Sequence, residues 1–462
     1  MVPPELLSET ISAIMSRTGA GFSDVYVELS RSKAIVMEDG KIEKILGGTD
    51  SGAGLRAISG GKTSYAYTNV LRKDAFLDAA GRLATAAGER EEKTLDLTKK
   101  TPLTDFRVRV LPDDVPLDRK LLLLTTADTA ARGVSSYVKQ VSILYRDLIQ
   151  KVQIASSDGL LAEDERLQSV FTITVIAEKD GVVQTGYESA GGFAGFELFD
   201  SVSTEELAVK AAQKAVMMLS ARRAPAGRMP VVISSEAGGT MIHEAVGHSL
   251  EADLALEGLS VYTGKIGQKI AADIVTVLDD STIPGKRGSF RFDDEGTFSR
   301  RNVLVKDGVL ASYMYDRLSA IKAGTESTGN GRRQSYRFRP IPRMTNTLIA
   351  PGKTPAADVL KSTSKGLFVK KMGGGQVNTL TGDFVFDVQE GYLIENGEAG
   401  EPVRGATLAG NGPQVLMQID MVGSDLGFSI GTCGKDAQGV PVSDAQPTIR
   451  VPEFVVGGAS EK

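Results

Sequence analysis

Two histidines and a glutamate near the middle of the chain are the residues best suited to metal chemistry. The 462-residue sequence contains only two histidines, His243 and His248, and Glu244 directly follows the first. Neutral imidazole is the commonest protein ligand for zinc, and a neighbouring carboxylate can act as the base toward a metal-bound water. The cluster therefore predicts a zinc site in which Glu244 activates the water.

The five-residue spacing of the histidines requires an irregular backbone. On a regular α-helix of about 100° per residue, positions i and i+5 diverge by about 140°, so the two rings could not bind one ion. A π-type turn, or a helix that ends between the histidines, would bring the rings together, and Gly247 is a suitable place for the irregularity. If the helix is instead regular, both histidines are simply polar residues on its surface.

A third metal ligand is needed, because a catalytic zinc usually has three protein ligands and one open position. The candidates are Glu251 and Asp253, one turn beyond His248, and Cys433, the single cysteine of the chain. Thiolate is a strong zinc ligand, and the glycines around Cys433 favour a position where the backbone comes close to another group. The residues alone leave these three alternatives open.

Composition excludes several classes of protein. The net charge is −5, from 53 Lys and Arg against 58 Asp and Glu, which argues against a general nucleic-acid or membrane binder. No apolar run reaches the roughly 20 residues of a membrane span, and the first ten residues lack the pattern of a signal peptide. One cysteine allows no internal disulfide and fits a reducing cytosol, so we expect a cytoplasmic protein.

Hydrophobic periodicity predicts an α+β fold with two domains. In the first domain, over residues 1–224, helices flank β-meanders, and a charged connection lies near 89–116. Residues 222–227 form the boundary, because Pro and Gly interrupt the pattern there. In the second domain, over residues 225–462, the metal-binding helix precedes many short strands. We expect these strands to form one continuous antiparallel sheet or an open barrel.

The chain resembles the TldD/PmbA metalloproteases, the TldD branch in particular, through motifs spread over most of its length. These motifs are His243–Asp253, Asp293–Thr297, Gly331–Arg333, Pro342–Asn346, Phe384–Phe386, Glu390–Ile394, Cys433–Lys435 and Gln446–Thr448. The PmbA (TldE) branch lacks the metal motif. Because this chain has the motif, it resembles the catalytic branch of the family.

The resemblance implies one zinc per catalytic subunit, bound by His243, His248 and Cys433, with Glu244 as the catalytic carboxylate. Glu251 and Asp253 then become candidates for orienting the histidine rings, unless they are merely solvated. The resemblance further implies a cytoplasmic peptidase for small or unfolded polypeptides. It would act as a homodimer or as a heterodimer with a non-catalytic PmbA/TldE-like relative.

An arginine-rich stretch follows in the second half and includes Arg332 and Arg333. It could hold a peptide carboxylate, stabilise an oxyanion, or bind phosphate or single-stranded nucleic acid. Structural salt bridges, for instance to the acidic residues 293–295, are the simpler interpretation.

Peptide substrates of varied sequence favour recognition through the main chain, by addition to a free strand edge. The Gly-rich segment and alternating strand at 373–388, including Gly382, Asp383 and Phe384, are a candidate for that edge. The alternative is that this strand is paired on both sides. A different class of function is also open, a metal-stabilised binding or regulatory protein without hydrolytic activity that engages a partner such as a DNA-acting enzyme.

Overall fold

The computed structural model describes residues 1–83 and 95–458 and has the α+β fold expected from the sequence. Residues 89–94 of the predicted connection lie outside the described residues. The elements of the first half are α1 (Pro4–Thr18), β1 (Phe22–Glu38), β2 (Lys41–Ser59), β3 (Lys62–Thr68), α2 (Lys73–Arg82), β4 (Thr98–Lys99), η1 (Pro112–Asp114), α3 (Leu117–Gly133), β5 (Val138–Ser156), β6 (Leu160–Lys179), β7 (Val182–Gly192), α4 (Leu198–Ser201) and α5 (Thr204–Ser220).

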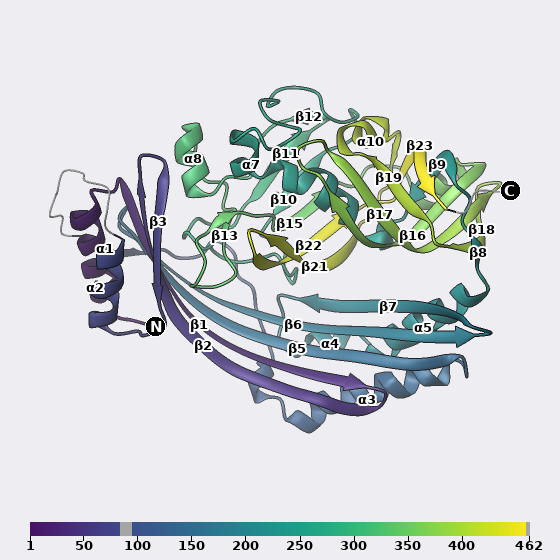
Figure 1. Cartoon of the computed structure of the whole chain (residues 1–462), viewed down its shortest axis with the longest axis horizontal. Helices are drawn as coiled ribbons and strands as arrows, with labels where there is room; N and C mark the ends of the chain where they lie inside the picture. Colours follow the sequence, from purple (N-terminus) through teal and green to yellow (C-terminus); the bar gives the residue numbers. More distant parts are fainter. Residues whose placement is uncertain (84–94, 459–462) are drawn as a thin grey trace.

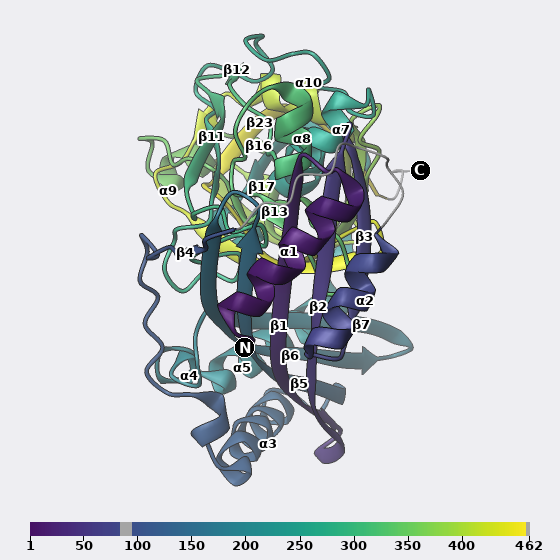
Figure 2. The same cartoon turned by 90° about the vertical axis from the view of Figure 1, so that its left-hand side faces the viewer.

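Long, curved strands form a seven-stranded sheet in the first half, in the order β3-β2-β1-β5-β6, with β4 and β7 both pairing with β6 (Figure 1). Helices cover the convex face of the sheet, and Figure 2 shows α1 and α2 lying side by side on it. Strand alternation explains this layering, because successive side chains point to opposite faces. Val25 and Val27 pack in the cluster that includes α1 and α2, whereas Tyr26 faces the second half of the chain.

The second half lies against the concave face of this sheet (Figure 1). Its strands are β8 (Arg222–Arg223), β9 (Gly227–Ile233), β10 (Val277–Asp280), β11 (Arg301–Lys306), β12 (Val309–Leu310), β13 (Gly331–Arg332), β14 (Ile341–Pro342), β15 (Asn346–Ile349), β16 (Lys365–Val377), β17 (Asp383–Glu395), β18 (Glu398–Arg404), β19 (Thr407–Asn411), β20 (Met421–Val422), β21 (Gly427–Lys435), β22 (Gln438–Gln446) and β23 (Ile449–Gly457). Its helices are η2 (Ser235–Ala237), α6 (Thr240–Ile242), η3 (His243–Gly247), η4 (His248–Leu250), α7 (Ala252–Leu256), α8 (Arg317–Ala323), α9 (Ala356–Lys361) and α10 (Gly412–Gln418).

The expected continuous antiparallel sheet or open barrel is wrong for the second half. A six-stranded sheet runs in the order β12-β11-β10-β15-β22-β21, and a separate eight-stranded sheet contains β9 and β16–β19. In the eight-stranded sheet, β16 pairs with both β9 and β17, so five strands (β16, β9, β23, β19 and β17) close into a ring. Parallel pairs such as β15 with β22 join segments almost a hundred residues apart, and such long-range pairing leaves no local signal in the sequence.

The strand edge predicted for substrate is also wrong in part. Phe384 pairs with Val377 of β16 on one side and with Gly410 of β19 on the other. Phe384 is buried, and its backbone hydrogen-bonding groups belong to the ladders of the ring. Asp383 begins the same strand and pairs with Asn411 of β19, and Gly382 directly precedes it, so this strand offers no free edge to a peptide.

Buried charges join the two halves of the chain. Arg56 in β2 donates from Nε to Asp24 Oδ2 at 2.8 Å and lies 2.7 Å from Glu295 Oε1 of the second half. All three side chains are at most 1% exposed. Arg166 of β6 similarly contacts Asp294 at 2.6 Å. Asp294 and Glu295 therefore pair with arginines of the first half, whereas Asp293 accepts hydrogen bonds from backbone N–H groups of Glu295, Thr297 and Gly331.

We propose a division into domains 1–224 and 225–462, with the short strand β8 at the end of the first domain pairing with β18 of the second. One large apolar cluster lies wholly within residues 224–456, whereas two other clusters involve residues of the first half alone. Among the described residues, no helix is long and apolar enough to cross a membrane.

Removing the cation of the buried network is expected to destabilise the protein. Arg56→Met removes the nearest cation from the buried carboxylates of Asp24 and Glu295, and such a loss typically costs about 3–5 kcal/mol. Calorimetry should show a marked fall in the unfolding temperature. The matched control, Arg82→Met, removes an exposed pair with Asp78 and should cost about 0.5 kcal/mol or less. Equal unfolding temperatures for the two variants would contradict a structural role for the network.

Candidate metal centre

The backbone between the two histidines forms the predicted π-type turn. Residues 243–247 make one π-helical turn, and the N–H of His248 donates to the carbonyl of His243, five residues earlier. A 3-10 turn over residues 248–250 follows. Gly247 has ordinary helical angles, but a Cβ there would lie 2.0 Å from the sulfur of Met344. Gly247 is therefore needed for close packing of the turn.

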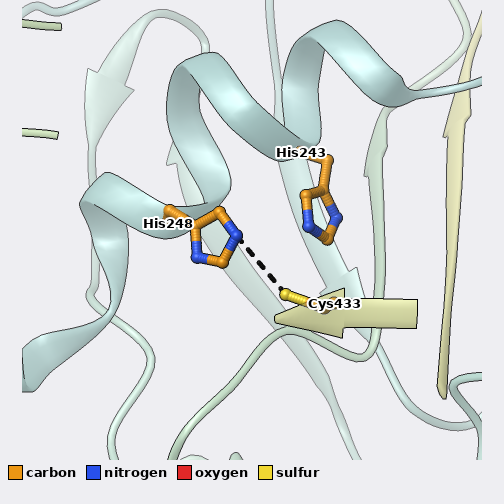
Figure 3. A group of neighbouring side chains, drawn as sticks. All are labelled: His243, His248 and Cys433. Atoms are coloured by element: carbon orange, nitrogen blue, oxygen red, sulfur yellow. Dashed lines mark hydrogen bonds between the residues drawn. The ribbon is translucent and has the colours of Figure 1, made fainter. Parts of the chain in front are cut away.

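The π turn brings both histidines to Cys433, which arrives from strand β21 (Figure 3). One ligand atom from each of the three side chains lies within 4.8 Å of the others. Cys433 Sγ is 3.4 Å from His248 Nε2, and Cys433 is buried. Two imidazole nitrogens and one thiolate are a donor set that suits a zinc-like ion.

Two carboxylates hold the far sides of the imidazole rings. Asp444 Oδ1 lies 2.7 Å from His243 Nδ1, and Glu251 Oε2 lies 3.1 Å from His248 Nδ1. Each ring therefore uses Nδ1 for a carboxylate and keeps Nε2 for the centre of the cluster. This carboxylate–histidine arrangement is the usual way in which proteins orient metal-binding imidazoles.

Glu251 is itself held by cations rather than turned toward the cluster. Its side chain is fully buried, with Lys435 Nζ at 3.1 Å and Arg343 Nε at 3.8 Å. Burial raises the pKa of Glu251, but Lys435 and His248 outweigh this effect and lower it to about 2. Asp253 bonds Lys435 at 2.6 Å. Of the three candidate third ligands, Cys433 is the one that lies in the cluster.

The histidines also favour the metal-binding form of the thiol. Burial raises the pKa of Cys433, but hydrogen bonds from His243 and His248 lower it to about 6. Burial lowers the pKa of His248, whereas Glu251 and Cys433 raise it to about 10. The histidines therefore stabilise the thiolate of Cys433, which is the form of cysteine that binds metal.

A pocket of about 630 Å³ opens beside the cluster, between the two halves of the chain. His243, Glu244 and Cys433 line it, together with residues of β7, β16 and β21. Glu244 is partly exposed, and its carboxylate has no hydrogen-bond or ion-pair partner among the described residues. A free carboxylate beside metal-binding side chains is suited to accept a proton from a water molecule in the pocket.

The two predicted substrate-binding arginines are placed in the protein interior. Arg332 donates to the carbonyls of Met344 and Pro441, and Arg333 donates to the carbonyl of Asp294. Both are buried, and neither lines the pocket that contains Glu244. Their contacts within the described chain resemble those of structural arginines.

Sequence reasoning missed Asp444, the partner of His243. The two residues are 201 positions apart, and a single acidic residue in a strand carries no metal-binding signal. Lys435 lies in a motif of the family resemblance, but its contact with Glu251 depends on the fold. These positions become visible only when β21 and β22 are placed beside the histidine turn.

Family models match almost the whole chain. A model described as the PmbA/TldA metallopeptidase C-terminal domain matches residues 226–458. The central domain of the same family matches residues 111–219, and its domain 1 matches residues 23–87.

Curated relatives carry metalloprotease names. A "Metalloprotease TldD homolog" of Haemophilus influenzae is 37% identical over 100% of this chain and 98% of its own length. A "Metalloprotease" of Methanothermobacter thermautotrophicus is 35% identical over 95% of each chain. A "Zinc metalloprotease TldD homolog" of Saccharolobus solfataricus is 28% identical over 95% of this chain and 97% of its own.

Solved structures share the fold at low sequence identity. A Thermotoga maritima protein, titled as a candidate modulator of a DNA gyrase, has a TM-score of 0.81 at 21% identity and covers 98% of this chain and 100% of its own. TldE from Thermococcus kodakarensis has a TM-score of 0.76 at 20% identity, with the same coverage. The resemblance found in the sequence motifs is confirmed, and the chain belongs to the PmbA/TldD metallopeptidase family.

Proposed function

We propose that this chain is a zinc-dependent peptidase that hydrolyses small or unfolded polypeptides. One observation carries the proposal: the three metal-binding side chains lie together beside an unpaired carboxylate, Glu244, in an accessible pocket. The metalloprotease names of the relatives, including one zinc metalloprotease, support the same class of reaction. A purely structural zinc site is closed and needs no free carboxylate beside its ligands.

The dimensions of the cluster suit zinc. Zn–N and Zn–S bonds of about 2.0–2.3 Å in a tetrahedral site separate neighbouring ligand atoms by roughly 3.5 Å. The 3.4 Å between Cys433 Sγ and His248 Nε2 agrees with this separation. His243, His248 and Cys433 would supply three ligands, and the pocket side would stay open. Glu251 and Asp444 would orient the rings, and Asp253 would contribute only through Lys435.

In the proposed reaction the metal and Glu244 have different roles. Zinc in this site would act as a Lewis acid that polarises the peptide carbonyl and makes water a better nucleophile. Glu244 takes the proton of the attacking water and delivers it to the leaving amine. Since Glu244 has no competing cation among the described residues, its carboxylate is free for both steps.

For substrate binding we propose the free edge of β21. This strand is the last of the six-stranded sheet, pairs only with β22 among the described strands, and carries Cys433. Its residues 428–433 line the pocket, opposite Gly373 and Gly374 of β16. An extended peptide added to this edge would lie beside the metal ligands, held by main-chain hydrogen bonds with little dependence on sequence.

The hairpin register identifies which groups of β21 are available. Lys435 pairs with Gln438 across a two-residue turn, so residues of odd number in β21 bond β22. The backbone groups of the even-numbered residues, 428 to 434, point away from β22. Thr432 lies opposite Pro441, which has no N–H, as expected for a non-hydrogen-bonded pair.

The proposed setting is the cytoplasm, and the proposed assembly is a homodimer or a heterodimer with a non-catalytic TldE-like relative. The shared fold with TldE supports a partner of this shape. The alternative is a binding or regulatory function without hydrolysis. Two solved structures with this fold are titled as gyrase modulators, but both proteins are under 25% identical to this chain, so their titles do not carry that function over. The unpaired Glu244 favours hydrolysis over that alternative.

Glu244→Gln should abolish hydrolysis without loss of metal. The amide cannot accept the water's proton, and general-base catalysis is worth about 10²–10⁴-fold in rate. Peptide cleavage and elemental analysis of the same purified sample test both statements, with Glu257→Gln, an exposed glutamate paired with Lys322, as the control. Cleavage at the wild-type rate by Glu244→Gln would remove this residue from the mechanism.

Substitution of the ligand Cys433, or of Asp444 beside His243, should lower the affinity for zinc. Asp444→Asn should weaken zinc binding about 10–100-fold, because the partner of His243 Nδ1 loses its charge. Cys433→Ser should weaken it further, since a hydroxyl is a poorer ligand than a thiolate. Competition with a chelating dye measures both, and the exposed Asp273→Asn serves as the control. Unchanged affinity in Cys433→Ser would exclude the thiolate as a ligand.

N-methylated peptides should test main-chain recognition. If the substrate pairs with β21, every second amide N–H of the peptide donates to that strand, so methylation at these positions should lower kcat/KM about tenfold. Methylation of the amides between them should leave kcat/KM nearly unchanged. The measurement is a methyl scan of one good substrate, with the unmethylated peptide as the reference. Equal losses at every position, or a strict requirement for one substrate side chain, would reject pairing with the strand edge.

A further inference from the structure

Lys286 is a half-buried cation at the wall of the pocket that the proposed hydrolysis does not use. It follows Gly285 in the loop after β10, and both residues line the pocket that contains His243 and Glu244. Burial lowers the pKa of Lys286. An ammonium group in such a position is only partly solvated, so an anion beside it would be bound more strongly than at an open surface.

The ammonium group of Lys286 is held in place but not neutralised. Its Nζ lies 3.9 Å from the centre of the Phe428 ring, which is a close cation–π contact. The backbone around it is anchored, because the N–H of Lys286 bonds Ile283 and its carbonyl accepts from Ser289. Across residues 1–83 and 95–458, no carboxylate lies within 4.0 Å of Nζ and no acceptor bonds it.

The second lysine of the pocket shows the contrast. Lys371 of β16 places its Nζ 2.7 Å from Glu188 and is therefore already paired. The pocket carboxylate Asp444 is engaged with His243, and Glu244 faces the proposed reaction. Among the described residues that line the pocket, Lys286 is thus the cation left to meet an anionic group of a bound molecule.

We propose that Lys286 is a specificity-determining residue that binds a carboxylate of the peptide substrate. The inference rests on the proposed peptidase function and adds a preference to it. The carboxylate is either the C-terminal α-carboxylate or the side chain of an Asp or Glu. Main-chain pairing with β21 would accept many sequences, and Lys286 would then select those with a negative charge at one distance from the cleaved bond.

The length of β21 between Cys433 and Phe428 gives the expected distance between the cleaved bond and the carboxylate. Phe428 and Cys433 both belong to β21 and are five residues apart, about 17 Å at roughly 3.3 Å per residue. An extended peptide along the same edge spans an equal number of residues. The preferred carboxylate should therefore lie about five residues from the cleaved bond, and not directly beside it.

A substrate scan on the zinc-loaded, full-length protein tests this preference. One neutral peptide is made with a single Glu, or the isosteric Gln, at each position in turn, and kcat/KM is measured for every pair. A second series ends at each position in a free carboxylate or an amide, which separates the two sources of the charge. The wild type should favour the carboxylate about tenfold at one position, mainly through KM.

Three variants assign the preference to the lysine. Lys286→Met should reduce the ratio of Glu to Gln peptides to about one, and Lys286→Arg should keep most of it. Lys286→Glu should favour a Lys peptide at the same position. Lys353→Met, an exposed lysine outside the pocket, is the matched control and should leave the ratio unchanged. The proposal is overturned if wild type and Lys286→Met show the same ratio at every position.

Binding measurements keep this inference separate from the proposed function. If neither the wild type nor any variant cleaves a peptide, the peptidase proposal fails. The same peptide pairs are then compared by calorimetric titration of binding. Tighter binding of the Glu or free-carboxylate peptide to wild type, lost in Lys286→Met, would still support carboxylate recognition. Equal affinities for both members of every pair would overturn it.

Discussion

Two imidazoles five residues apart can share one ion only if the backbone between them leaves α-helical geometry. The π turn at residues 243–247 meets this requirement and puts both rings on the same side of the chain. The turn is wide and packs closely, because Gly247 leaves room for the sulfur of Met344. Everything proposed for the site depends on this turn, since a regular helix would separate His243 and His248.

The remaining parts of the site are arranged by a six-stranded sheet behind the turn. One hairpin, β21–β22, brings Cys433 to the two histidines and Asp444 to the ring of His243. Lys435, at the end of the same hairpin, balances the charge of buried Glu251. A single supersecondary unit therefore supplies Cys433, the carboxylate beside His243 and the counter-charge of Glu251, which makes their relative positions rigid.

The cleft beside the metal centre exists because the two halves of the chain are held together. Arg56 and Arg166 on the curved sheet pair with the buried Glu295 and Asp294, and the strand β7 lines the same pocket as the hairpin that carries Cys433. The edge of β21 stays unpaired within this cleft. The proposed binding of an extended peptide with a carboxylate rests on this free strand edge and on the half-buried ammonium group of Lys286.

The sequence by itself determined what is local: the α+β class, from hydrophobic periodicity, and the need for an irregular backbone between the histidines, either a π-type turn or the end of a helix. It also identified Cys433 as one of three candidate ligands, because residue chemistry restricts the donors. The tertiary structure decided what depends on contacts distant in the chain. It paired β17 with both β16 and β19, buried Arg332 and Arg333, and brought Asp444 to His243. The last contact joins residues 201 positions apart, and a contact at such a separation leaves no pattern along the chain.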